Sequence, residues 1–318
     1  MTLHIVNPFA NAFGGSERGA LELWRGVAGK CETILWSEDA PDPRLGETPI
    51  RRIDLKRGEH PRGGTLLLHG NFFLPGPWLE SSGPRCTLLG YNTVVRPDLK
   101  YAMIERLQRL GPFEIVYASR LVRDWVGVPG VVLPSRIDLA RFVPRKRAAD
   151  DDFIVGRLSR DELPKHHPED PAIYRALAAR GARVRIMGGT CLGEAHNDLA
   201  GVELLPAGAM DATQFLQGLD CFYYRTSPNW SEAGGRVVAE AMACGLPVVC
   251  HAIGGYAEWI EHGRSGYLFE SDDEALRLID SLRQDPGLRQ SVGRAAREAM
   301  VAMYSPEAAR AYFEFFVR

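Results

Sequence analysis

Short, mainly apolar runs alternate with stretches of helical periodicity along the chain. Residues 3–6 and 65–69 are such runs, and they are typical of strands that are buried on both faces of a parallel sheet. Between them, residues 16–27 repeat apolar side chains at helical spacing. Parallel strands need a crossover connection, which is usually a helix, so this alternation predicts an α/β fold with parallel sheets.

The alternation stops once and then restarts, which divides the chain into two domains. Residues 143–152 form a charged stretch without apolar periodicity and predict a linker. We therefore expect a first domain over residues 1–145 and a second over residues 150–303, each of ordinary domain size. A proline-led start predicts a last helix within residues 304–318.

Composition and charge limit which binding partners and which cellular location we expect for the protein. Hydrophobic residues make up 45% of the chain, charged residues 25%, and the net charge is −2, so nothing indicates binding to nucleic acid. The six cysteines form no C-x-x-C pair, which predicts reduced thiols and no metal site. The chain opens without a signal-peptide pattern, and no apolar run approaches the roughly 18 residues of a membrane helix. We expect a cytoplasmic protein whose only membrane contact is peripheral, at the inner membrane.

Residues 231–249 carry the strongest chemical signal in the sequence. Glu232 and Glu240 flank the pair Gly234 and Gly235, and an apolar-periodic helix starts after the glycines. We expect Glu232 on a loop and Glu240 about two turns into this helix. The N-terminus of a helix without bulky side chains suits an anion, because unpaired N–H groups and the helix dipole both favour negative charge.

This stretch allows two kinds of chemistry. In the first, a phosphate lies at the helix start and the two carboxylates hold sugar hydroxyls. In the second, Glu232 and Glu240 are the acid and the nucleophile of a glycosidase, whose carboxylates flank one bond. The glycosidase hypothesis leaves the phosphate-type features unused, so we rank it second.

Two cations of the second domain are expected close to the same place. Arg157 and Lys165 lie on the loop that follows the first strand of this domain, and residues 231–235 follow a later strand. In a doubly wound parallel sheet both loops open on the same edge. Two fixed cations beside a helix N-terminus would hold a diphosphate without a metal ion.

The first domain offers a glycine turn and one histidine. Gly14 and Gly15 connect the first strand to the first helix, either as a tight turn or as a loop along which a ligand approaches the backbone. His69 ends a buried strand, where residues line the ligand crevice of open parallel sheets. The alternative for His69 is a hydrogen bond that caps the strand.

Several of these motifs occur together in one known family. The relevant segments are Gly156-Arg157-Leu158 with Lys165, Glu232-Ala-Gly-Gly, Glu240-Ala-Met-Ala-Cys-Gly-Leu-Pro-Val-Val, Gly254-Gly255 with Glu258, and Gly14-Gly15-Ser-Glu17. With them the chain resembles the retaining glycosyltransferases of the large bacterial family 4. The resemblance implies the GT-B architecture, in which two Rossmann-like domains face each other across a cleft.

The resemblance also implies an activity. The chain would be a metal-independent retaining glycosyltransferase that moves a hexose-type sugar from a UDP- or GDP-sugar to an acceptor hydroxyl, with no other cofactor. The acceptor would be a glycan or a lipid-linked molecule, in bacterial polysaccharide or glycolipid synthesis. Two alternatives share the fold: a nucleotide-sugar hydrolase or epimerase, and a protein that binds the nucleotide without turnover.

Residue roles follow from the same resemblance, position by position. Arg157 and Lys165 would bind the diphosphate, Glu240 the ribose and Glu232 the transferred sugar. Sugar and phosphate would also meet the backbone of Gly234, Gly235 and Arg236. From the first domain, Gly14 and Gly15 would approach the diphosphate and His69 would contact the donor sugar or the acceptor. The last helix would cross back to the first domain.

Overall fold

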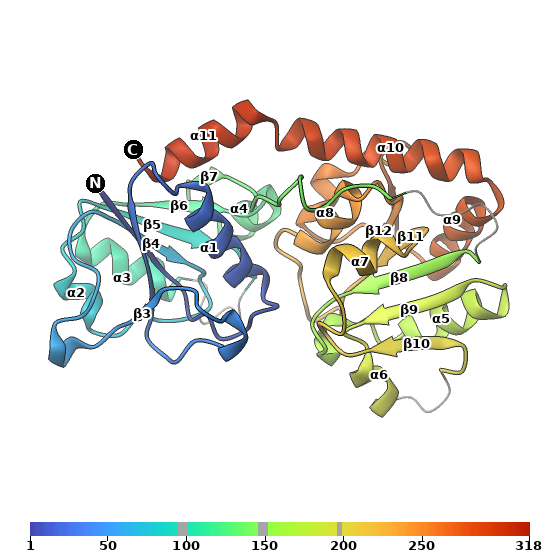
Figure 1. The fold of residues 1–318 in the computed structure, drawn as a ribbon, viewed down its shortest axis with the longest axis horizontal. Helices are drawn as coiled ribbons and strands as arrows, with labels where there is room; N and C mark the ends of the chain where they lie inside the picture. The colour runs from blue at the N-terminus through green and yellow to red at the C-terminus, as the bar shows by residue number, and fades with distance from the viewer. Residues whose placement is uncertain (95–100, 146–151, 196–198) are drawn as a thin grey trace. The chain divides into compact units, whose positions relative to one another are not determined.

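A computed structural model describes residues 1–94, 101–145, 152–195 and 199–318 of the chain. Their contacts form two compact units (Figure 1). Unit 1 comprises Met1–Arg136 together with Pro306–Arg318, and unit 2 comprises Ile137–Ser305. The linker expected at residues 143–152 falls largely on residues 146–151, which lie outside the described residues. The chain therefore leaves unit 1 once and returns to it with its last helix.

Unit 1 is built on a parallel sheet with the strand order β3-β2-β1-β4-β5-β6-β7. Every described pairing in this sheet is parallel. The strands are β1 (Thr2–Val6), β2 (Glu32–Ser37), β3 (Ile50–Arg52), β4 (Thr65–His69), β5 (Cys86–Tyr91), β6 (Phe113–Tyr117) and β7 (Val131–Val132). The continuous apolar runs of β1 and β4 occupy the centre of the sheet, where both faces are covered.

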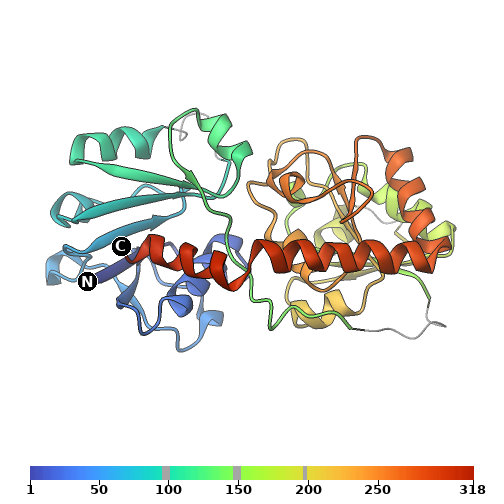
Figure 2. The same ribbon diagram turned by 90° about the horizontal axis from the view of Figure 1, so that it is seen from above.

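Helices cover the sheet of unit 1, and the last helix of the chain is one of them. The helices are α1 (Gly15–Gly26), α2 (Trp78–Ser81), α3 (Ala102–Leu110), α4 (Arg120–Val126) and α11 (Pro306–Phe316). One face of the sheet packs Leu3, Ile5 and Leu67 against α1 and α11. Tyr312 and Phe316 supply the apolar face of α11 in this core, and Figure 2 shows α11 lying over the sheet.

Unit 2 has a second parallel sheet, with the strand order β10-β9-β8-β11-β12-β13. The strands are β8 (Ile154–Leu158), β9 (Arg183–Met187), β10 (Val202–Leu205), β11 (Cys221–Tyr224), β12 (Val248–His251) and β13 (Tyr267–Phe269). Their described pairings are all parallel. This order is that of the doubly wound Rossmann sheet.

The helices of unit 2 cover both faces of its sheet. They are α5 (Asp170–Ala179), α6 (Thr190–Ala195), α7 (Ala212–Gln217), α8 (Arg236–Ala243), α9 (Asp272–Gln284) and α10 (Pro286–Met303). Phe222 and Val248 face a core shared with α7, α8 and α10. Tyr223 and Val249, one position further on, face a core shared with α5 and α9. Successive strand residues point to opposite faces, so two adjacent residues reach two cores.

Each sheet has one place where its strand order reverses. In unit 1 it lies between β1 and β4, and in unit 2 between β8 and β11. Ligands of open α/β sheets bind beyond the carboxyl ends of the strands at such points. The expected α/β fold with two Rossmann-like domains is confirmed. The site of unit 1 is therefore expected after β1 and β4, and that of unit 2 after β8 and β11.

Candidate functional site

The turn from β11 into α8 requires a glycine at one position. Gly235 precedes α8 with φ +71°, a left-handed conformation, and a Cβ there would lie 2.5 Å from Cδ1 of Tyr256. An L-residue would therefore be both strained and in collision with the ring. The helix begins at Arg236, so Glu240 lies about one turn into α8 and the expected two turns were wrong. The later start brings the Glu240 carboxylate close to the helix N-terminus.

Glu232 lies on the loop before this turn, as expected, and forms an ion pair. Its Oε2 accepts hydrogen bonds from Lys165 Nζ at 2.7 Å and from the Tyr224 hydroxyl at 2.9 Å. Lys165 ends a short 3₁₀ turn in the loop after β8. The structure therefore brings together Glu232 and Lys165 from the two loops that flank the reversal of strand order in unit 2.

The ion pair fixes the charge of both partners. Burial alone would raise the pKa of Glu232, but the charge and hydrogen bond of Lys165 and the Tyr224 hydroxyl outweigh burial and lower it. Burial lowers the pKa of Lys165 against the opposing effect of Glu232. A carboxylate and an ammonium group are thus held side by side, ready to accept and to donate hydrogen bonds.

An indole ring lies against the cations of this loop. Lys165 Nζ lies 4.3 Å from the centre of the Trp230 ring, and the Arg160 guanidinium lies 5.3 Å from it. Such contacts stabilise a cation by about 0.5–1 kcal/mol at exposed sites and more when they are desolvated. Thr226 holds the Trp230 carbonyl by a hydrogen bond of 2.8 Å. Trp230 therefore helps to fix the position of the Lys165 ammonium group.

Arg157 was expected on the loop after the first strand of this unit, but it lies within β8 and has no exposed surface. Its guanidinium donates to the carbonyl oxygens of Lys165 and Arg225 and lies 3.5 Å from the carboxylate of Asp170. Its carbon Cζ is 4.7 Å from the centre of the Tyr224 ring. The family resemblance implied direct contact between Arg157 and a diphosphate. In this structure its Nη groups are bonded to protein, so direct contact would require the network to open.

Glu240 is fully buried, and only one of its two carboxylate oxygens accepts a hydrogen bond from a described residue. Its Oε1 accepts a hydrogen bond of 2.9 Å from Arg236 Nε. Its Oε2 is also buried and accepts no hydrogen bond from any residue that the structure describes. A buried carboxylate oxygen without a donor is costly, and a ligand hydroxyl would remove that cost. The expected ribose hydroxyl is a group of the right chemistry.

In unit 1, three polar side chains meet around His69 at the carboxyl end of β4. Asn7 Nδ2 donates to the His69 carbonyl at 2.6 Å and to Ser16 Oγ at 2.9 Å. Asn92 Nδ2 donates to Ser16 Oγ at 3.0 Å and lies 3.3 Å from His69 Nδ1. These side chains follow β1, β4 and β5 or open α1, so the reversal of strand order in unit 1 gathers them.

The surroundings of His69 define its protonation state. Burial lowers the pKa of His69 to about 4, so the ring is neutral at pH 7. Since an amide N–H can only donate, Asn92 makes Nδ1 an acceptor and leaves the proton on Nε2. A cavity of about 20 Å³, room for one water molecule, borders His69, Asn92 and Ser135. His69 is therefore a neutral hydrogen-bond donor at Nε2. This N–H group is available to a ligand, so a hydrogen bond that caps the strand is not the sole role open to the side chain.

The glycine pair of unit 1 separates into two roles. Gly14 is buried at the start of α1, and a Cβ there would lie 1.9 Å from the Glu17 carboxylate. Gly15 is exposed, with nothing within 4 Å of a Cβ at its position. Gly14 thus lies against the Glu17 side chain, whereas the backbone of Gly15 is open to a ligand.

The partners that hold these residues were not predicted from the sequence. Asp170, Tyr224 and Trp230 in unit 2, and Ser16 and Asn92 in unit 1, were not selected as site residues. Asn92 offered a signal, because it directly follows a buried strand. Asp170 looked like an ordinary acidic residue at a helix start.

Metal and membrane features are absent from the part of the chain that the structure describes. No group of three or more His, Cys, Asp or Glu residues there is placed to hold a metal ion. None of its helices is both long and apolar enough to span a bilayer.

Sequence comparison supports the family resemblance. Residues 196–299 match the family model of glycosyl transferases group 1. The chain is also similar to a D-inositol 3-phosphate glycosyltransferase of Pseudarthrobacter chlorophenolicus, with 29% identity over 300 residues. That match covers 80% of this chain and 71% of the relative.

Comparison with solved structures supports the fold. HepE of Anabaena, solved in complex with UDP-glucose, superposes with a TM-score of 0.77 at 15% identity and covers 99% of this chain and 98% of its own. A sucrose-phosphate synthase of Thermosynechococcus elongatus gives a TM-score of 0.75 at 17% identity, with 99% of both chains covered. At these identities the likeness concerns the fold alone.

Proposed function

We propose that this chain is a group 1 glycosyltransferase that moves a hexose-type sugar from a nucleoside-diphosphate sugar to an acceptor hydroxyl. In this proposal the anomeric configuration is retained and no metal ion takes part. One observation carries it. Lys165 and Glu232 form an ion pair between the loops that follow β8 and β11, and the unsatisfied Oε2 of Glu240 belongs to α8, the helix that begins four residues after Glu232.

The main task of such an enzyme is to stabilise the leaving group. Negative charge grows on the β-phosphate as the bond between the sugar and the phosphate breaks. Lys165 and the N-terminus of α8 are the positive groups that would meet this charge. Removing one fixed donor of this kind typically costs about 10²–10³ in rate.

The two carboxylates would orient the donor. Glu232 accepts hydrogen bonds from sugar hydroxyls, with Lys165 and Tyr224 holding it in the ionised state. Glu240 accepts a ribose hydroxyl at Oε2, where no described residue donates. The backbone of Gly234, Gly235 and Arg236 meets the sugar and phosphate as the chain enters α8.

Retention can be reached without a protein nucleophile. The acceptor oxygen attacks the anomeric carbon from the side that the phosphate leaves, and the departing phosphate takes the acceptor proton. One C–O bond forms and one breaks, so atoms and charges balance. Glu232 then has no nucleophilic role, in contrast to the glycosidase alternative.

Unit 1 offers two groups that suit a sugar or acceptor ligand. His69 offers the Nε2–H of a neutral ring, a donor suited to a sugar hydroxyl or to an acceptor oxygen. Gly15 offers an open backbone at the start of α1 for close approach of a ligand. These roles need no change of protonation near pH 7.

Similar proteins guide the choice of substrates to be tested. HepE binds UDP-glucose, and the P. chlorophenolicus relative is described as acting on D-inositol 3-phosphate. We propose a UDP- or GDP-sugar as donor and a glycan or lipid-linked acceptor in cytoplasmic polysaccharide or glycolipid synthesis. Contact with the inner membrane would be peripheral.

The test follows the donor by NMR. Purified protein is incubated with UDP-, GDP-, ADP- and TDP-glucose, each with and without a panel of polyol phosphate, glycan and lipid-linked acceptors, and with EDTA in parallel. We expect one donor to be consumed faster with one acceptor, to give a product with the donor's anomeric configuration, and to be unaffected by EDTA.

Three results would overturn parts of this proposal. Sugar release at the same rate without acceptor would identify a hydrolase. An inverted anomer would exclude retention, and loss of activity in EDTA would exclude metal independence.

A further inference from the structure

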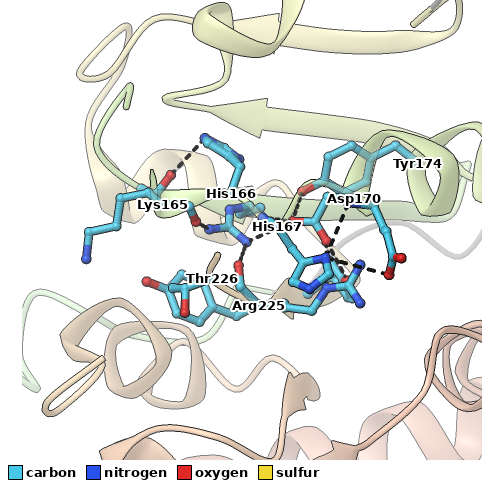
Figure 3. A network of polar contacts seen from close by, with 12 residues as sticks. Lys165, His166, His167, Asp170, Tyr174, Arg225 and Thr226 are labelled. Atoms are coloured by element: carbon cyan, nitrogen blue, oxygen red, sulfur yellow. Dashed lines mark hydrogen bonds and ion pairs between the residues drawn. The ribbon is translucent and has the colours of Figure 1, made fainter. Parts of the chain in front are cut away.

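A buried carboxylate at the start of α5 organises the polar network beneath the donor site. Asp170 has no exposed surface, and its Oδ1 accepts hydrogen bonds of 2.9 Å from Tyr223 and from Arg225 Nε. Its Oδ2 accepts from the backbone N–H of His167 at 3.1 Å and from Tyr174 at 3.4 Å. Figure 3 shows Asp170 between Tyr174 and Arg225.

Asp170 balances two buried cations. The Arg157 guanidinium lies 3.5 Å from its Oδ2, and Arg225 bonds to its Oδ1. Arg225 has a second partner, Asp272 at 2.5 Å, at the start of α9. No other ion pair of Arg157 is formed with a described carboxylate. Asp170 is therefore the anchor of the Arg157 charge.

Arg157 in turn holds the loop that carries Lys165. One Nη group donates to the Lys165 carbonyl and the other to the Arg225 carbonyl at the end of β11. The two carbonyl groups belong to the two loops that flank the reversal of strand order. In Figure 3 the Lys165 carbonyl faces the network while its side chain extends away from Asp170.

The same guanidinium also supports Glu232. It stacks on the ring of Tyr224, whose hydroxyl donates to Glu232 Oε2. Arg157 thus touches the backbone of one member of the Lys165–Glu232 pair and the hydrogen-bond partner of the other. A shift of this guanidinium would move both.

We infer that Asp170 is a positioning residue of the donor site, which acts through Arg157 to set the distance and orientation of Lys165 and Glu232. This inference rests on the proposed function and deepens it. The buried negative charge of Asp170 is the essential feature, because it keeps two guanidinium groups at one point.

The variant Asp170→Asn isolates that charge. It keeps the shape of the side chain and one acceptor oxygen, but it leaves the Arg157 charge buried without a carboxylate. Uncompensated buried charges are strongly unfavourable, so Arg157 should move toward water or toward another anion. Displacement of reacting groups by about 1 Å can cost on the order of 100-fold in rate.

Two control variants bracket the effect. Tyr223→Phe removes one neutral hydrogen bond to Asp170 and keeps the charge. Asp280→Asn removes a carboxylate that pairs with Arg180 at 3.3 Å, in the same unit but away from the Lys165 loop. If Asp170 had only a structural role, Asp170→Asn would lower the melting temperature but would match these controls in nucleotide affinity and kcat.

The experiment measures nucleoside diphosphate affinity by calorimetry and donor turnover, on full-length protein well below the melting temperature of each variant. UDP, GDP, ADP and TDP serve as probes. For Asp170→Asn we expect affinity for the bound nucleotide to fall roughly 10-fold and kcat roughly 10- to 100-fold. Both controls should stay within about twofold of the wild type.

The outcomes separate this inference from the proposed function. Wild type that binds a nucleotide, together with Asp170→Asn of unchanged affinity and kcat, would overturn the positioning role and leave the proposed function standing. Wild type that binds none of the four nucleotides would overturn the proposed function itself. If Asp170→Asn does not fold, Arg157→Lys gives the same test, since it keeps the charge but cannot hold both carbonyl groups.

Discussion

Two histidines, one in each unit, are buried as neutral rings. Burial lowers the pKa of His69 to about 4, and burial with the nearby charge of Arg157 does the same for His166. Nε2 of His166 lies 2.8 Å from the Gly188 carbonyl. At His69, protonation would cost the hydrogen bond that Nδ1 accepts from Asn92. At His166 the bond to Gly188 favours the charged ring, but burial and Arg157 outweigh it.

Their low pKa values predict acid sensitivity with a definite sign. Between pH 6.5 and about 4 the unfolded chain binds protons at these positions and the folded chain does not. The free energy of unfolding should therefore fall as the pH drops through this window, by up to roughly 3 kcal/mol for each histidine. Urea unfolding at several pH values gives the free energy of unfolding as a function of pH. The slope of this free energy against pH should be smaller for His166→Gln than for the wild type. The exposed His262→Gln variant is the control, and an equal slope in all three proteins would refute the assignment.

At the scale of single elements, the junction between β11 and α8 is the least tolerant part of the donor site. Gly235→Ala would place a methyl group 2.5 Å from the Tyr256 ring at φ +71°. We expect a loss of about 1–3 kcal/mol in the stability of unit 2 and weaker nucleotide binding, because the start of α8 must move. Thermal melting with and without nucleotide measures both effects.

A matched glycine separates strain from collision. Gly263 has φ +80°, but a Cβ there meets nothing within 4 Å. Gly263→Ala should therefore cost less stability and leave nucleotide binding intact. Equal losses of binding in the two variants would mean that the position of the α8 start does not matter.

Elements were more predictable than their connections. The alternation of apolar runs and periodic helices predicted parallel sheets, and the glycines before α8 predicted a helix start that the structure places at Arg236. The predicted position of Glu240 within α8 was wrong by a turn, because local signals define a helix end only to within a few residues. The identity of Glu232 and Lys165 as candidates came from the motif pattern, and their contact is a result of the fold.

The network beneath the site was not predictable in the same way. Asp170 meets Tyr223 and Arg225, which are more than 50 positions away in the sequence. No local pattern distinguishes such a residue from a solvated helix cap. Only the strand order, which puts β8 beside β11, gives Asp170 and Arg157 their role.

At the scale of the whole molecule, the last helix completes unit 1 from the far end of the sequence. Tyr312 and Phe316 of α11 pack in the core that contains Leu3, Leu67 and Leu88. Phe313 lies so close to α1 that a Cβ on Gly26 would meet its ring at 2.1 Å. The stability of unit 1 therefore depends on residues that follow the whole of unit 2 in the chain.

This dependence predicts a selective effect of one substitution. Phe316→Ala should lower the free energy of unfolding of unit 1 by about 3 kcal/mol or more, since a buried aromatic ring is lost, and should leave unit 2 nearly unchanged. Hydrogen exchange resolved by peptide measures both units at once. Val301→Ala, at an exposed position of α10, is the control. Equal protection loss in both units would contradict the assignment of α11 to unit 1.

The central claim is that residues of unit 2 bind the nucleotide of the donor. The most direct test measures nucleotide affinity by titration calorimetry for the wild type, Glu240→Gln and Lys165→Ala. We expect one of UDP, GDP, ADP and TDP to bind the wild type. Glu240→Gln and Lys165→Ala should each weaken that binding about 10-fold or more, through loss of the ribose acceptor and of the phosphate cation. Failure of all four nucleotides to bind, or unchanged affinity in both variants, would contradict a donor site at the start of α8.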